Sequence, residues 1–99
     1  MVESIASRTL KYSSPQGESG EAVIHITKPR PDKQDWSCSI HIAGIEKEVS
    51  RSVYGIDSLQ CLVLAFGMMH ARLDLLQKSG YRFFWLGKKG YGFETINDK

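Results

Sequence analysis

The chain has 99 residues, of which 41% are hydrophobic and 24% are charged. This length and composition are typical of a folded globular protein, so we expect one domain over residues 1–99. The formal net charge is only +2, from 13 basic and 11 acidic side chains, which argues against a dedicated nucleic-acid-binding or membrane-surface protein.

The N-terminal sequence MVESIASRTLKYSS has no apolar core of the kind that a secretory signal requires. No run of the sequence approaches the ~18 apolar residues of a membrane span. We therefore expect a cytoplasmic protein with no membrane partner. Cys38 and Cys61 are too few for a disulfide scaffold. We expect free thiols packed in the core, with an oxidised pair as the alternative.

Three segments in the first half of the chain alternate between apolar and polar residues, as strands with one buried face do. These segments are residues 4–12, 21–28 and 35–42. The second strand is expected to stop at Pro29-Arg30-Pro31, because proline has no backbone donor. Ala43-Gly44 is predicted to be a short hairpin turn, followed by a return strand over residues 45–53.

One long helix is predicted over Asp57–Ser79. Asp57 is a suitable N-cap, Gln60 stands at the capping-box spacing, and Gly80 is placed to end the helix. Apolar residues recur at helical spacing and are expected to face the core. They are Leu59, Leu62, Val63, Phe66, Met69, Leu73 and Leu76.

After the helix, the aromatic segment 81–87 is predicted to be a last short strand. The glycines that follow favour a hairpin over a phosphate-binding loop, because no helix comes after them. The order of elements predicts an α+β fold: a four-stranded antiparallel meander plus a C-terminal strand, packed on one long helix. Trp36, Ile40, Leu62, Phe66 and Leu73 are expected in one core.

The sheet face that points away from the helix is predicted to be polar and to bind a partner. It is expected to carry His25, Ser37, Ser39, His41, Glu46 and Glu48. A metal site or a general base could form there, but zinc needs three or four converging ligands, and the sequence has no close ligand pair. We interpret the histidines as surface residues, and predict no catalytic residue, metal or cofactor.

The predicted helix carries a second apolar stripe, which a helix covering one sheet does not need. Leu64, Met68 and Leu75 lie along one line of it. If these side chains were exposed, they would form a patch that a monomer rarely tolerates. We therefore expect them to be covered by the Tyr91–Ile96 tail, by a second copy of the chain, or by another protein.

Several motifs resemble those of a group of small bacterial proteins that share a domain of unknown function. The similar segments are YGIDSLQCLVLA (54–65), MHARL (69–73), WLG (85–87), GF (92–93) and WSC (36–38). The resemblance covers nearly the whole chain in the same order, and it implies no activity, cofactor or catalytic residue. Physically, the first motif is typical of a helix start, with Gly55 for the turn, Asp57 as the cap and Leu59 as the first core contact.

These observations favour a non-enzymatic protein-binding module. Its concrete form would be a bacterial immunity protein that neutralises a cognate toxin, and its partner is either such a protein or a second copy of the chain. One alternative is a single-stranded nucleic-acid-binding protein that uses the basic and aromatic residues 81–93. A second alternative is an enzyme that uses His25 and His41 with Glu46 or Glu48.

Overall fold

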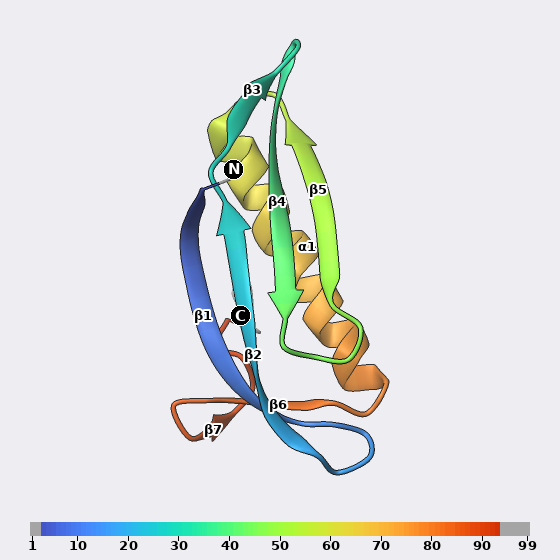
Figure 1. The fold of residues 1–99 in the computed structure, drawn as a ribbon. Helices are drawn as coiled ribbons and strands as arrows, with labels where there is room; N and C mark the ends of the chain where they lie inside the picture. Colours follow the sequence, from blue (N-terminus) through green and yellow to red (C-terminus); the bar gives the residue numbers. More distant parts are fainter. Residues whose placement is uncertain (1–2, 94–99) are drawn as a thin grey trace.

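The computed structural model describes residues 3–93 of the chain. These residues form one antiparallel sheet with a single helix against one of its faces (Figure 1). The elements are β1 Ser4–Ser13, β2 Ser19–Thr27, β3 Arg30–Asp32, β4 Asp35–Ala43, β5 Val49–Gly55, α1 Ser58–Lys78, β6 Arg82–Trp85 and β7 Lys88–Lys89. The predicted α+β class, an antiparallel sheet packed on one long helix, is confirmed.

The sheet is a meander with an extension at one end. β1 pairs with β2, β2 with β4, and β4 with β5, while β6 and β7 continue from the last residues of β1. Ile24 lies opposite Ile42, and Trp36 shares the face of Ile42 on β4, so Ile24 and Trp36 lie on the same face of the sheet. Figure 1 shows α1 running along β4 and β5, with the opposite sheet face uncovered by any described element.

The second strand ends at Thr27, just before the proline-rich segment, as predicted, but strand pairing resumes within that segment. After Thr27 the chain leaves the ladder briefly and then pairs again as β3, where Arg30 lies opposite Ser37 and Pro31 opposite Trp36. Within the described sheet β3 has β4 as its one neighbour. Proline is tolerated at such an edge, because no second strand needs its missing N–H.

The connection between β4 and β5 is a five-residue loop, Gly44–Glu48, and the predicted two-residue turn is wrong. Ile45 folds into the core with 6% of its surface exposed, so it cannot begin the return strand. The Tyr12 hydroxyl donates to the Gly44 carbonyl at 2.9 Å, and the Gly44 N–H donates to the Glu48 carboxylate at 3.2 Å. These contacts hold the loop against β1.

The helix begins and ends where the sequence predicts. The Asp57 carboxylate accepts a hydrogen bond from the Gln60 N–H at 2.8 Å, and the Gln60 side chain accepts one from the Ile56 N–H at 2.6 Å. Two donors that the first turn leaves without helical partners are thereby satisfied. At the other end, Ser79 caps the helix and Gly80 follows in a left-handed conformation.

The side of the helix that faces the sheet differs from the prediction. Its buried residues are Cys61, Ala65, Met69 and Leu73. Leu59, Val63 and Phe66 were expected in the core, but 69%, 62% and 44% of their surfaces are exposed. The small side chains of Cys61 and Ala65 let the helix lie close to the sheet. A prediction that relies on the largest apolar residues therefore selects the wrong side of the helix as the one that faces the sheet.

By length and composition alone, α1 is long and apolar enough to cross a membrane, which corrects the expectation that no segment comes near this. The core helix of a protein that spans no membrane can pass the same test. In this structure one side of α1 packs against β4 and β5. What needs explanation is the apolar side that faces away from the sheet.

Candidate functional site

The uncovered sheet face carries a row of polar residues across four strands. Ser7 of β1 lies opposite His25 of β2, His25 opposite His41 of β4, and His41 opposite Ser50 of β5. The two imidazole rings stack with their centroids 4.7 Å apart. Ser37 and Ser39 lie further along the same face of β4. Four of the six residues predicted for this face are therefore on it.

The two acidic residues predicted for this face lie elsewhere. Glu46 and Glu48 belong to the β4–β5 loop, and Glu46 lines a hollow with Tyr12 and Tyr81 near the end of α1. Their expected position beside the histidines is wrong, because the return strand begins four residues later than its apolar spacing indicates. Within residues 3–93, no three His, Cys, Asp or Glu side chains converge in a way that could hold a metal ion.

The pKa of His25 is lowered from its ordinary value of about 6.5, chiefly by burial and secondarily by the neighbouring His41. Protonation is therefore less favourable in the folded chain than in the unfolded chain. The stability that this neutral imidazole contributes is complete above pH ~6.5 and is lost as the pH falls through the lower folded pKa. NMR titration of the imidazole protons should show His25 titrating below 6.5, and closer to that value in His41→Gln. A His25 pKa above 6.5 would contradict this account.

The second candidate surface is the side of α1 that faces away from the sheet, which we call the open face. The exposed apolar and small residues on it are Leu59, Val63, Leu64, Gly67, Ala71 and Leu75. Leu64 and Leu75, two members of the predicted second stripe, are 42% and 55% exposed. Met68, the third member, is half-buried and packs against the core. From Cys61 to Ala71 the helix has no Asp, Glu, Lys or Arg.

The described part of the C-terminal tail covers a different side of the helix from Leu64 and Leu75. Tyr91 is buried and its hydroxyl donates to the Asp74 carboxylate. Phe93 packs edge-on against Phe66, with ring centroids 6.3 Å apart. At 100° per residue, Phe66 lies roughly opposite Leu64 on the helix. Residues 94–96 of the predicted covering segment lie outside the described residues.

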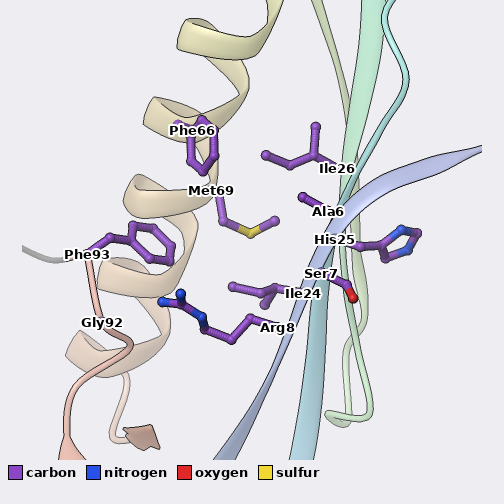
Figure 2. Close-up of a pocket in the computed structure, with 10 residues that line it drawn as sticks. All are labelled: Ala6, Ser7, Arg8, Ile24, His25, Ile26, Phe66, Met69, Gly92 and Phe93. Carbon is purple, nitrogen blue, oxygen red and sulfur yellow. The ribbon is translucent and has the colours of Figure 1, made fainter.

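Between α1 and the first two strands lies an apolar pocket of about 240 Å³ (Figure 2). Ile24, Ile26 and Ala6 form its sheet side, and residues of α1 and the tail form the other. Figure 2 shows the His25 side chain pointing away, to the opposite sheet face. Arg8 points into the pocket from β1, and the sequence interpretation overlooked it. The available signal was a charged residue on the face of β1 that was predicted to be apolar.

The two cysteines are free thiols, and both are buried between the sheet and the helix. The Cys38 sulfur donates to the Cys61 carbonyl across 3.6 Å. Burial is the largest influence on each thiol and raises both pKa values. A raised pKa disfavours the thiolate, which is the reactive form. This environment suits packing and does not suit nucleophilic chemistry.

The aromatic residues near the C-terminus are largely engaged within the molecule. Phe83 and Tyr91 are fully buried, and the Trp85 ring is covered by the Arg8 guanidinium at 3.6 Å from its centroid. The segment forms the β6–β7 hairpin that the sequence predicts. Few aromatic faces in it are therefore open for stacking against the bases of a single strand.

These observations define a two-layer α+β protein in which one sheet face and the outer side of the one described helix are both uncovered. Residues 6–95 match the family described as a domain of unknown function (DUF6968), and the chain belongs to that family. The matched range includes the polar row and the open face. No curated protein and no solved structure matches the chain.

Proposed function

We propose that this protein is a non-enzymatic protein-binding module, and that the open face of α1 receives an apolar surface of another polypeptide chain. The observation that carries the proposal is the exposure of four large apolar side chains, Leu59, Val63, Leu64 and Leu75, on the side of α1 that faces away from the sheet. A surface helix normally turns a charged or polar side to water. A contiguous apolar patch on a monomer generally marks an interaction site.

A protein partner fits the open face better than a lipid surface does. Helices that lie on membranes usually carry Lys and Arg on the side next to their apolar residues, and the middle of α1 has neither. Gly67 and Ala71 stand at the centre of the face, one helical turn apart. Small side chains there allow a second helix to approach closely, since the distance between packed helices depends on the residues at the contact.

Gly67 supports this proposal because nothing inside the molecule requires a glycine there. A Cβ atom added at this position would meet no atom within 4 Å. Glycine in a helix interior costs roughly 1 kcal/mol relative to alanine. We therefore expect Gly67→Ala to raise the free energy of unfolding by about 1 kcal/mol in urea denaturation of the isolated chain. The same substitution should weaken partner binding, and a variant that gains stability without weakening binding would remove Gly67 from the contact.

The test of the proposed function is a charge placed on the open face. Val63→Glu should leave the stability of the isolated chain within about 0.5 kcal/mol, because Val63 is exposed. It should abolish assembly. Assembly is measured as the mass of the particle that the wild-type chain or the variant forms, both as the isolated chain and as purified with its bound protein from the native cell. Thr9→Glu on the uncovered sheet face is the matched control and should keep the wild-type assembly. A wild-type monomer without a bound protein, or assembly that survives Val63→Glu, would contradict the proposal.

A bacterial immunity protein that neutralises a toxin is the narrower form of this proposal. It is supported by the small size of the chain and by its two uncovered faces, although Glu46 and Glu48 do not lie at the edge of the polar face. An adjacent reading frame that encodes a toxin is the observation that would favour it. The geometry gives less support to single-stranded nucleic-acid binding, because Phe83 and Tyr91 are buried.

A further inference from the structure

The pocket beside β1 has the properties of a small ligand site that is separate from the open face. Ile24, Ile26 and Met69 form its interior and are all at most 5% exposed. Phe66 and Phe93 stand on the helix and tail side (Figure 2). Its volume of about 240 Å³ equals that of roughly eight water molecules in the liquid. The interior thus fits a short, flexible apolar chain.

Among the residues that line this pocket, Arg8 is the one whose charged group points into it. His25 also belongs to the lining, but its imidazole points to the opposite sheet face (Figure 2). Its guanidinium carbon lies over the Trp85 ring, 3.6 Å from the centroid, and Nη1 donates to the Tyr91 carbonyl at 3.0 Å. These two contacts fix the orientation of the group before any ligand arrives. A guanidinium has five N–H donors, so most of its hydrogen-bonding capacity is left for a ligand.

No carboxylate of residues 3–93 lies within ion-pair distance of Arg8, and the ion pair found in this part of the chain joins His70 and Asp74. A half-buried cation without an acidic partner is complemented by an anion from outside. A guanidinium and a carboxylate can form a planar, bidentate pair with two parallel N–H···O hydrogen bonds. One positive charge next to an apolar cavity suits a monoanion better than a phosphate.

We propose that this pocket binds an aliphatic monocarboxylate, with its carboxylate on Arg8 and its hydrocarbon chain between β2 and α1. The rigid guanidinium provides the charge recognition. The side chains of Ile24, Ile26 and Met69 form the floor of the half-open pocket, against which the hydrocarbon chain lies. This ligand site goes beyond the proposed protein-binding role and uses a different set of contacts.

Isothermal titration with a series of carboxylates at pH 7 tests the proposal. Affinity should rise roughly fifteenfold from hexanoate to octanoate, since each buried methylene is worth about 0.8 kcal/mol. It should stop rising once the chain exceeds the cavity, so that decanoate and dodecanoate bind alike. Octanoate should bind at least tenfold more tightly than 1-octanol, as expected for a hydrogen-bonded charge.

Two pairs of variants locate the site. Arg8→Gln should remove the preference for octanoate over octanol, whereas Arg51→Gln, the same change at an exposed arginine of β5, should preserve it. Ala6→Phe should fill the pocket and abolish binding, whereas Thr9→Phe, an exposed position on the opposite sheet face that does not line the pocket, should leave the affinity within twofold. The proposal is overturned by equal affinity for octanoate and octanol, by no binding of octanoate at millimolar concentration, or by binding that Ala6→Phe leaves intact.

Discussion

Tyr91→Ala is expected to lower the free energy of unfolding by roughly 3–5 kcal/mol, as truncations of buried aromatic residues usually do. Tyr91 is fully buried although it stands near the end of the described chain. Its ring packs against His70 and Phe93, with centroids 5.6 and 5.1 Å away. Its carbonyl accepts from Arg8, and its hydroxyl donates to Asp74. One residue thus joins the tail to both the helix and the first strand.

Tyr91→Phe is the control for this substitution, because it keeps the ring and removes the hydroxyl alone. We expect it to cost about 1 kcal/mol, the usual net worth of one hydrogen bond. Urea unfolding followed by tryptophan fluorescence measures both variants. A loss below 1 kcal/mol in Tyr91→Ala would mean that the tail does not depend on this anchor.

Gly44→Ala should destabilise the chain by about 3 kcal/mol or more. Gly44 has a φ of +89°, and a Cβ atom there would lie 2.3 Å from the backbone oxygen of Glu21. The left-handed conformation costs a residue with a side chain roughly 1–2 kcal/mol. Overlap with a backbone atom adds about 1–3 kcal/mol, because the strand must move to relieve it.

Gly17 provides a matched control for Gly44. Its φ is +88°, almost the same, but no atom lies within 4 Å of the Cβ position. Gly17→Ala should therefore cost only the conformational part, roughly 1–2 kcal/mol. The difference between the two variants in urea denaturation measures the steric overlap at the loop. Equal losses would show that the β4–β5 loop does not press against β2 as described.

The strands and the helix were predictable because each depends on local signals. Period-two alternation identifies β4, where Cys38, Ile40 and Ile42 are all buried. Asp57 and Gly80 mark the helix ends through their own chemistry. The β4–β5 loop was not predictable in this way. Ile45 is apolar and buried whether it begins a strand or folds inward from a loop, so its hydrophobicity does not distinguish the two.

The candidate sites were harder to predict because they depend on which side of the helix meets the sheet. Hydropathy ranks Phe66 and Leu59 above Ala65 and Cys61, yet the close approach of strand and helix requires the small residues. A Cβ atom at Gly55 would lie 2.9 Å from the Cys61 nitrogen. Gly55 therefore permits this approach and needs no left-handed turn. The pocket escaped notice because its parts come from β1, β2, α1 and the tail, which no local pattern joins.

The most direct test of the central claim is site-specific photo-crosslinking in the native cell. A photoreactive phenylalanine derivative replaces Val63 or Leu75 on the open face, or Thr9 on the uncovered sheet face as the control. We predict covalent adducts with a protein, either another chain or a second copy, from positions 63 and 75 and none from position 9. Adducts from position 9 alone would place the partner on the sheet. Adducts only with lipid from the helix positions would contradict the assignment of a protein-binding face.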